Sequence, residues 1–465
     1  MDTSFVQALR DICGQRSVLD AKALSGRDSG FHPDNLGAEL AVKPRTTDQV
    51  AAIVRLCNRH GVAIVPHGGL TGLAGGAASY PGQLILSTSD MQDTLVIDPR
   101  SRVAHVSAGV TLDALDTAAR EHGLCAGIDI AARGTATMGG MIATNAGGSE
   151  AFRNGIMRDR VLGLEAVTAT GIVVSDLKQV VKANEGIDVG QIFIGSEGTL
   201  GVITRAVLRL EPAPRECCTL IVSFADVDAA LGAYRAFGDM PAGNLMRAEI
   251  MWRNYAVETA MALGLLSILP DAEQPVHVIF EVEPNGMSVD ALLEPVAEIL
   301  DAAGCEDVVV AQSERDRRNI WLVREESWAL ERNFPHGFWY DVSLPLGELE
   351  TYVDRIEREL HTFEPSIRVF VMGHLGDGNL HLTIAGKAEM PELHRSVSDI
   401  VYRGLADTGS AFSAEHGIGS EKVNDLARLG DPGKLAVMRL IKDALDPGAI
   451  LNPGKVIPHT KNTGR

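Results

Sequence analysis

Glycine-rich segments constrain the fold of this chain more than any other feature, because glycine tolerates backbone conformations that other residues resist. Glycine is unevenly spread: it crowds into residues 61–82, 134–155 and 195–201, and it returns in 373–378 and 417–419. Short β-branched segments alternate with the first three clusters, which predicts strands that run into glycine-rich loops. The first half of the chain is therefore expected to be rich in loops.

The alternation of apolar and turn residues predicts a mixed α+β protein. In the first half, strands are expected at 62–65, 84–86, 103–106 and 171–174, and helices at 47–60 and 112–122. Farther along, strands are expected at 218–223 and 277–282, with a closing helix at 432–451. After Pro212-Ala213-Pro214 the pattern changes to longer helices and alternating strands. The expected domains are therefore 1–215 and 216–430. A C-terminal helix and Asn-Pro-Gly segment over 431–458 and a tail over 459–465 follow them.

Length and charge exclude several classes of protein. At 465 residues the chain exceeds what one hydrophobic core usually serves. Its net charge of −19 argues against a nucleic-acid partner, since that binding depends on Lys and Arg. No apolar run approaches the ~20 residues of a membrane span, and the N-terminal segment lacks the features of a secretory signal. The six cysteines form no CxxC pair, which favours reduced thiols. We therefore expect a cytoplasmic protein without a membrane span.

The first glycine loop, Pro66 to Gly76, reads PHGGLTGLAGG and follows an apolar strand. Successive glycines allow backbone N–H groups to turn toward an anion, so a pyrophosphate is the expected guest. A flexible surface loop is the alternative interpretation. The loop is neither a Walker loop, since no Lys-Ser/Thr follows, nor a Rossmann GxGxxG turn.

Two histidines flank a second turn, in the stretch GHLGDGNLHLT from Gly373 to Thr383. If Asp377-Gly378 forms a two-residue turn, His374 lies directly opposite His381 on one face of the hairpin. Their β-carbons would be ~5 Å apart, close enough for both rings to reach one divalent ion. Two histidines on an exposed ribbon remain the alternative.

A third ligand is available in the segment SAEHGIGSEK, where glycines follow Glu415 and His416. Two imidazoles and one carboxylate leave an open coordination position, which is typical of a reactive metal site. This donor set suits zinc, and it also suits manganese or cobalt. His416 would then stand beside the metal as a candidate base, the alternative being a helix-end or core histidine.

The first half resembles the FAD-binding domain of the vanillyl alcohol oxidase and p-cresol methylhydroxylase flavoproteins. The resemblance rests on the first glycine loop, on VKPRTTDQVAAIV at Val42, on a second glycine loop over 134–148 (GTATMGGMIATNAGG), on RDRVLGLEAV at Arg158, and on a third glycine loop over 195–204 (GSEGTLGVIT). It implies a two-subdomain FAD-binding domain of the p-cresol methylhydroxylase type. The implied FAD contacts are Pro66, His67, Gly68, Gly69, Leu70, Thr71, Gly72, Leu73, Gly76, Thr137, Gly140, Thr144, Asn145, Gly147, Glu197 and Val202.

One departure from that family concerns the covalent state of the flavin. Members that bind FAD covalently often carry a histidine where this chain has Leu70. Leucine cannot form such a bond, so FAD is expected to be non-covalent. His67 is out of register for the linkage and is expected to serve as a hydrogen-bonding residue of the loop.

The second half resembles the C-terminal FAD-linked oxidase domain of D-2-hydroxyacid dehydrogenases, through HLGDGNLH, AEHGIG and LNPGK. This group includes D-2-hydroxyglutarate dehydrogenase, flavin-dependent D-lactate dehydrogenase and the flavin subunit of glycolate oxidase. The resemblance implies that His374, His381 and Glu415 bind the metal, that His416 is the catalytic base, and that Asn452 lies near the flavin. The implied reaction is metal-assisted hydride transfer from a D-2-hydroxy acid to FAD N5.

Residues 321–345 resemble the substrate segment of that group. Arg324 matches an arginine that grips a substrate carboxylate, although a surface salt bridge is an alternative role. Trp328, Trp339 and Thr383 replace the threonine, lysine and asparagine of the hydroxyglutarate-specific pattern, and Tyr340 is a further expected contact. The replacements favour an apolar, aromatic or short side chain, as in D-lactate or D-mandelate, unless the tryptophans are core residues.

Other functions stay open at this point. D-2-Hydroxyglutarate dehydrogenase is the nearest alternative, followed by an NADPH-dependent FAD reductase, a non-catalytic flavin-binding protein and a zinc hydrolase. The implied partners are a small 2-hydroxy acid and an electron acceptor, which could be a quinone, a cytochrome, an electron-transfer flavoprotein or oxygen. A homodimer is also open.

Overall fold

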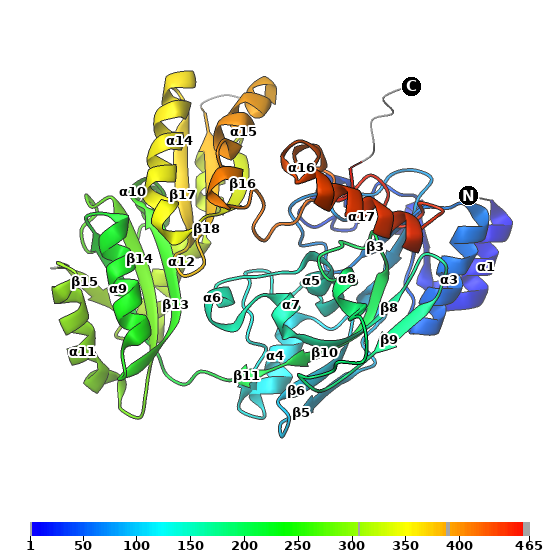
Figure 1. Ribbon diagram of the computed structural model, residues 1–465, viewed down its shortest axis with the longest axis horizontal. Helices are drawn as coiled ribbons and strands as arrows, with labels where there is room; N and C mark the ends of the chain where they lie inside the picture. The colour runs from blue at the N-terminus through cyan, green and yellow to red at the C-terminus, as the bar shows by residue number, and fades with distance from the viewer. Residues whose placement is uncertain (1, 306, 387–390, 459–465) are drawn as a thin grey trace. The chain divides into compact units, whose positions relative to one another are not determined.

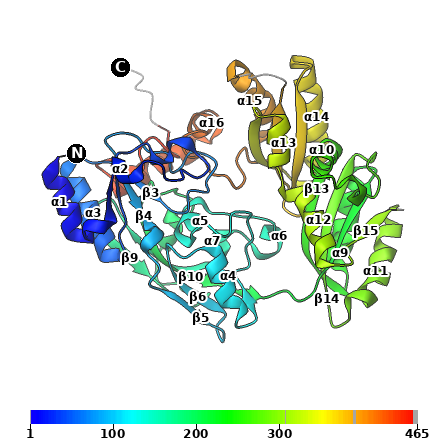
Figure 2. The same ribbon diagram turned by 180° about the vertical axis from the view of Figure 1, so that it is seen from behind.

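The computed structural model describes residues 2–305, 307–386 and 391–458, so the predicted tail over 459–465 lies outside the described residues. The chain divides into two compact units (Figures 1 and 2). Unit 1 comprises Met1–Gly148, Asn154–Ala213 and Glu415–Arg465, and unit 2 comprises Ser149–Arg153 and Pro214–Ala414. Residues 415–430, which we expected in the second domain, thus pack with unit 1.

Unit 1 begins with a four-stranded sheet in the order β1-β2-β4-β3. Its strands are β1 (Val18–Asp20), β2 (Leu40–Val42), β4 (Leu84–Ser87) and β3 (Ile64–His67). Helices α1 (Thr3–Cys13) and α3 (Thr47–His60) pack against it. Helix α3 begins where the Thr46 side chain accepts a hydrogen bond from the Gln49 N–H, and it ends at Gly61 in the left-handed conformation. The strand β3 delivers the chain directly into the first glycine loop.

A five-stranded sheet forms the second layer of unit 1, in the order β5-β6-β10-β8-β9. The strands are β5 (Leu95–Asp98), β6 (Val103–Ser107), β10 (Val202–Arg209), β8 (Val161–Val167) and β9 (Val173–Asp176). A separate pair joins β7 (Leu124–Cys125) to β11 (Glu211–Pro212). The other helices that include residues of unit 1 are α2 (Ala21–Leu24), α4 (Leu112–Arg120), α5 (Met138–Thr144), α6 (Ala151–Asn154), α7 (Met157–Arg160), α8 (Gly190–Phe193), α16 (Val423–Leu429) and α17 (Pro432–Leu445).

Unit 2 is built on one antiparallel seven-stranded sheet, in the order β15-β12-β14-β13-β17-β18-β16. The strands are β15 (Val308–Val310), β12 (Cys218–Phe224), β14 (Val276–Pro284), β13 (Gly243–Trp252), β17 (Arg368–His374), β18 (Asn379–Ala385) and β16 (Phe338–Ser343). Its longer helices are α9 (Val227–Asp239), α10 (Arg253–Leu263), α11 (Val289–Ala302), α12 (Glu314–Glu325), α13 (Trp328–Asn333), α14 (Leu349–Phe363) and α15 (His394–Tyr402).

Both faces of this sheet are covered by helices, as the two views show (Figures 1 and 2). On one face Phe280 packs against Phe237 of α9. On the other, Ile279 and Phe370 join a core with residues of α10, α12 and α13. Only part of this second face is apolar, because the strands β13, β17, β18 and β16 also carry the charged and histidine side chains described below.

The helices and strands expected from the sequence are confirmed, with shifts of a few residues at their ends. The closing helix is shorter than expected and ends at Leu445. Among the residues that the structure describes, we find no helix with the length and apolarity needed to span a bilayer. The mixed α+β fold class is therefore confirmed.

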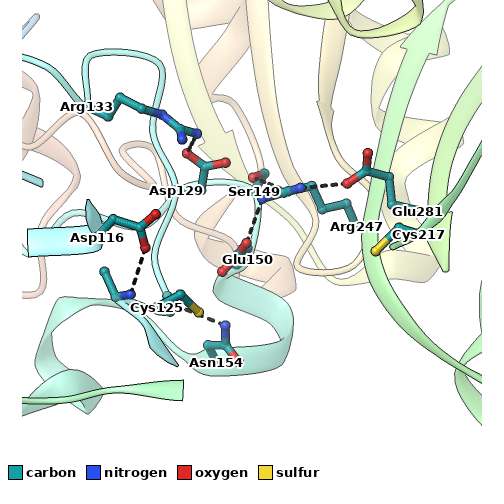
Figure 3. Close-up of polar contacts among 12 residues, drawn as sticks. Asp116, Cys125, Asp129, Arg133, Ser149, Glu150, Asn154, Cys217, Arg247 and Glu281 are labelled. Carbon is teal, nitrogen blue, oxygen red and sulfur yellow. Dashed lines mark hydrogen bonds and ion pairs between the residues drawn. The ribbon is translucent and has the colours of Figure 1, made fainter. Parts of the chain in front are cut away.

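A short segment from the first half of the chain, Ser149–Arg153, is held in unit 2 by Arg247 of β13 (Figure 3). The Arg247 guanidinium contacts Glu150 at 2.7 Å and Glu281 at 2.6 Å, and its Nε lies 3.3 Å from the Ser149 hydroxyl. Burial alone would raise the pKa of Glu281, but Arg247 and Arg317 hold that pKa below its usual value. Arg247 thus pairs with two buried carboxylates at once.

Replacing Arg247 with methionine is expected to destabilise unit 2 by about 3 kcal/mol, because a buried carboxylate would lose its counter-charge. All four tryptophans lie in unit 2, so urea unfolding followed by tryptophan fluorescence measures this unit. The exposed pair of Arg395 and Asp399 offers the control, and Arg395→Met should change the unfolding free energy by less than about 1 kcal/mol. Equal losses in both variants would contradict the assigned role.

Candidate active site

The first two glycine loops lie against each other in unit 1. A β-carbon added at Gly69 would clash with the Thr135 carbonyl oxygen, and one added at Gly68 would lie 2.7 Å from the Thr137 hydroxyl. Only glycine permits this approach of two backbones. Residues 68–71 are half-buried, so their backbone is available to a cofactor laid across the loops.

His67 ends β3 and is buried beneath the first loop. Its Nε2 lies 2.8 Å from the Ala77 carbonyl oxygen. Burial disfavours the charged imidazolium and lowers the pKa of His67 to about 4. The neutral ring therefore holds the loop closed, as the sequence predicted. Leu70 adopts the left-handed conformation, with φ of 59°, and its side chain offers no atom for a covalent bond to flavin.

The second loop folds into α5, whose N-terminus is capped by the Thr137 hydroxyl. The Thr144 hydroxyl donates to the Gly140 carbonyl, and Asn145 ends the helix in the left-handed conformation. The Asn145 side chain then accepts a hydrogen bond from the Arg158 N–H. Three of the predicted FAD contacts thus fix the local backbone, and residues 143–146 remain half-buried.

The third loop joins the other two through Glu197 and Asn452. The Glu197 N–H donates to the Ala143 carbonyl, and the Asn452 amide donates to the carbonyls of Gly76 and Glu197. The buried Lys455 ammonium in turn donates to the Asn452 side chain at 2.6 Å. The three glycine loops and the C-terminal segment, which carry the predicted flavin contacts, therefore come together within unit 1. Their half-buried glycine backbone fits a flat, anionic cofactor such as FAD.

The turn that carries Glu415 and His416 is fixed by the same loops. Both Glu197 carboxylate oxygens accept backbone N–H groups, from Ile418 at 2.7 Å and from Gly419 at 2.9 Å. Burial raises the pKa of Glu197, although these two N–H groups and nearby lysines oppose the rise. The Glu415 carboxylate accepts from the Gly148 N–H at 3.0 Å. The predicted base His416 thus lies on a turn clamped to the flavin loops.

The histidine hairpin of unit 2 has a different register from the one predicted. His374 pairs with Asn379 and His381 pairs with Met372, so the loop has four residues instead of two. Leu375 is buried, and its N–H donates a hydrogen bond to the Ala248 carbonyl of β13. Leu375 therefore does not pair with β18. The two histidines are nevertheless diagonal neighbours on one face, with ring centroids 5.5 Å apart. Their nearest ligand atoms lie within 4.8 Å of each other.

Two buried carboxylates, which were not predicted from the sequence, lie beside the Nδ1 atoms of these histidines. Glu249 of β13 is 1% exposed and lies 2.7 Å from the His374 Nδ1. Asp341 of β16 is fully buried and lies 3.9 Å from the His381 Nδ1. Asp341 also accepts the Ala414 N–H at 3.0 Å, and Ala414 directly precedes Glu415 in the chain. Metal-binding histidines commonly have such carboxylate partners.

The predicted substrate residues are placed unequally. On strands β16 and β18, Trp339 pairs with Thr383, and Asp341 pairs with His381 two residues farther along β16. Side chains two residues apart on a strand point to the same side, so both pairs share one face of the sheet. Trp328 and Trp339 are 51% and 45% exposed, which excludes the alternative that they are core residues. Both tryptophans are therefore available to a ligand.

Arg324 and Tyr340 depart from simple substrate contacts. Arg324 is almost buried, and its Nε donates to Glu249 at 2.8 Å. Arg324 therefore forms a buried salt bridge with Glu249, and not the surface salt bridge that the sequence left as an alternative. Tyr340 is wrongly predicted, because it lies on the sheet face opposite to His381, where its hydroxyl is 3.0 Å from Ser398 of α15. Strand alternation places neighbouring side chains on opposite faces.

Comparisons with known proteins identify the two domain families of the chain. Residues 213–456 match the family of the C-terminal domain of FAD linked oxidases, and residues 38–176 match the FAD binding domain family. Mitochondrial D-2-hydroxyglutarate dehydrogenase of Bos taurus is 36% identical, over 90% of this chain and 77% of that protein. D-lactate dehydrogenase of Anaerostipes hadrus is 33% identical, over 90% of this chain and 89% of that protein.

Solved structures confirm the predicted fold. A substrate-bound p-cresol methylhydroxylase has a TM-score of 0.75 at 19% identity and covers 99% of this chain and 98% of its own. At that identity the likeness shows the fold alone. Because the oxidase-domain match covers more than half of the chain and the relatives cover most of it, this FAD-dependent oxidoreductase belongs to the family of FAD-linked oxidases that includes the D-2-hydroxyglutarate and D-lactate dehydrogenases.

Proposed function

We propose that this chain oxidises a D-2-hydroxy acid to the corresponding 2-oxo acid, with FAD as the electron acceptor within the protein. The observation that carries the proposal is the polar face of the seven-stranded sheet. There His374 and His381 lie together, each with a buried carboxylate beside it, and Trp339 and Thr383 lie next along the same face. The relatives named D-2-hydroxyglutarate and D-lactate dehydrogenase support the same class of reaction.

A divalent metal fits the donor set of this face. The carboxylate of Glu249 engages the Nδ1 of His374, which leaves the Nε2 as the ligand atom. Glu415 is the proposed third ligand, as the resemblance of AEHGIG to the family motif implies. Two imidazoles and a carboxylate suit zinc, and also manganese or cobalt. When bound, such an ion supplies a Lewis acid for the hydroxyl of the substrate.

His416 is the proposed base. Oxidation of a 2-hydroxy acid removes the hydroxyl proton and a hydride from C2, and a carbonyl forms. His416 accepts the proton from the hydroxyl oxygen, a role suited to an imidazole. It is partly exposed and stands beside Glu415 on the turn that Glu197 holds. When bound, FAD supplies the acceptor for the hydride.

The surroundings of the histidines favour a monocarboxylic substrate. Arg324 is the proposed partner of the substrate carboxylate, but Glu249 already offsets its charge. Trp339 and Thr383 bring no second cation to the face, and Trp328 adds a further exposed indole. Indole surfaces stabilise apolar and aromatic groups. We therefore propose a short, aliphatic or aromatic side chain, as in D-lactate or D-mandelate, in preference to a dicarboxylate.

Anaerobic reduction of the flavin by a substrate panel tests this proposal. D-Lactate, longer aliphatic D-2-hydroxy acids and D-mandelate are each compared with D-2-hydroxyglutarate and with the L-enantiomers. We expect kcat/KM for the best monocarboxylate to be at least roughly tenfold higher than kcat/KM for D-2-hydroxyglutarate. Contacts in a binding pocket discriminate between similar substrates by factors of this size. Trp339→Lys should narrow that ratio by restoring a cation. A clear preference of the parent for the dicarboxylate would refute the proposed specificity.

D-2-Hydroxyglutarate dehydrogenase remains the second candidate, because relatives of that name reach 36% identity. The panel decides between the two substrates directly. A non-catalytic flavin protein would show no bleaching of the flavin by any hydroxy acid, and an NADPH-dependent reductase would be reduced by NADPH. The final electron acceptor is proposed only by class, as a quinone, a cytochrome or an electron-transfer flavoprotein.

A further inference from the structure

Glu249 occupies a central position on the polar face of unit 2. It lies on β13, where its register partner on the next strand is His374. The side chain is 1% exposed, and its two carboxylate oxygens serve two different residues. One oxygen lies 2.7 Å from the His374 Nδ1, and the other accepts a hydrogen bond from the Arg324 Nε at 2.8 Å. A proposed metal ligand and a proposed substrate-binding residue therefore share one carboxylate.

The contact with His374 determines which ring nitrogen can bind a metal. An ionised carboxylate accepts hydrogen bonds but cannot donate them. The Nδ1 of His374 must therefore carry the hydrogen in this contact, and the Nε2 keeps its lone pair when the ring is neutral. The same bond prevents rotation of the ring. Carboxylate partners of this kind commonly raise metal affinity by 10- to 100-fold.

The contact with Arg324 has a second consequence. The guanidinium is planar, so a hydrogen bond from its Nε fixes the direction of the two terminal nitrogens as well. An arginine held in this way is pre-organised to meet a carboxylate, and less side-chain entropy is lost when the anion binds. The Tyr255 hydroxyl also donates to the Arg324 carbonyl at 2.7 Å, which anchors the backbone at the end of α12.

We propose that Glu249 is a positioning residue that sets the metal ligand His374 and the anion-binding residue Arg324 in one arrangement. This inference rests on the proposed function. It predicts that one substitution at Glu249 weakens both metal binding and substrate binding, whereas substitutions at its two partners separate them. A buried ion pair with a purely structural role would lower stability without producing that pattern.

The first experiment compares Glu249→Gln, His374→Gln and Arg324→Gln in FAD-loaded protein. Zinc affinity is measured by competition with a chromogenic chelator, independently of turnover. We expect Glu249→Gln to weaken zinc binding roughly 10- to 100-fold. His374→Gln should weaken it at least as much, whereas Arg324→Gln should weaken it clearly less than Glu249→Gln does, because Arg324 is not among the proposed ligands.

The second measurement is the KM for the best substrate of the panel at saturating zinc. Arg324→Gln and Glu249→Gln should both raise this KM, roughly tenfold or more, because a charged hydrogen bond to the carboxylate is lost or misdirected. Glu249→Asp keeps the charge but shortens the side chain, and should fall between the parent and Glu249→Gln in both measurements.

Glu281→Gln is the matched control for a structural role. Glu281 is also buried on this face and paired with Arg247 and Arg317, but it is not bonded to either histidine. Its replacement should lower the urea midpoint of unit 2 and leave zinc affinity within about threefold of the parent. The inference is overturned if Glu249→Gln also leaves zinc affinity within that range. If the parent protein binds neither zinc, manganese nor cobalt, the proposed metal site itself is wrong. This result differs from one in which the parent and Glu249→Gln bind zinc with equal affinity, which overturns only the role of Glu249.

Discussion

Replacing His416 with alanine is expected to slow flavin reduction by a 2-hydroxy acid by roughly 10²- to 10⁴-fold, the usual contribution of a positioned base. The residue lies on the turn at 415–419, which Glu197 and Gly148 tie to the flavin loops. Alanine removes the imidazole without altering the glycines that shape this turn. Anaerobic stopped-flow measurement of the flavin absorbance at saturating substrate isolates the reductive step from later electron transfer.

Two controls separate loss of the base from loss of the site. FAD content and zinc affinity should match the parent, because the side chain of His416 is not among the proposed ligands. His122→Ala removes an exposed histidine elsewhere in unit 1 and should leave the rate unchanged. If His416→Ala reduced its flavin at the parent rate with every active substrate, the proton would have to leave by another route.

Local patterns in the sequence were sufficient for most of the fold. The bounds of α3 follow from a capping threonine and a terminal glycine, and both signals are contained in neighbouring residues. The glycine loops were found for the same reason, since a run of glycines after an apolar strand marks a tight turn wherever it occurs. The structure then brings these loops together, a step that no single motif contains.

The hairpin shows where local reasoning fails. Asp377-Gly378 is a strong signal for a two-residue turn, but the register depends on contacts from outside the hairpin. Leu375 leaves the ladder because β13 offers a hydrogen-bond acceptor at Ala248 and a buried place for the side chain. A β-carbon at Gly378 would clash with the carbonyl oxygen of Leu344, another distant residue. The two histidines share a face in either register because both registers keep the parity of the strands.

Glu249 and Asp341 were missed for a related reason. Glu249 lies 125 residues before His374 in the chain, and only the sheet order makes them neighbours. A signal was nevertheless present, because Arg247 and Glu249 alternate within the otherwise apolar run from Leu245 to Trp252. Charged residues at alternate positions of a central strand indicate buried ion pairs on one face, since buried charges are stable only when they are paired.

Removing one imidazole from the proposed metal site is expected to have an effect of similar size. His381→Ala should abolish tight zinc binding and slow flavin reduction at least roughly 100-fold, since a Lewis acid contributes several kcal/mol and about 1.4 kcal/mol corresponds to a factor of ten. Prolonged chelation of the parent should give the same loss. Re-addition of zinc, manganese or cobalt should restore the rate of flavin reduction in the chelated parent but not in the variant. Metal content measured together with the rate shows whether the loss of rate follows the loss of metal.

The matched control for His381→Ala is a histidine of the same unit outside the polar face. His394 stacks on Tyr340, which lies on the opposite side of the sheet from His381. His394→Ala should therefore bind zinc and reduce its flavin like the parent. If chelation removed all metal from the parent and the rate of flavin reduction did not change, the two histidines would have to act on the substrate directly.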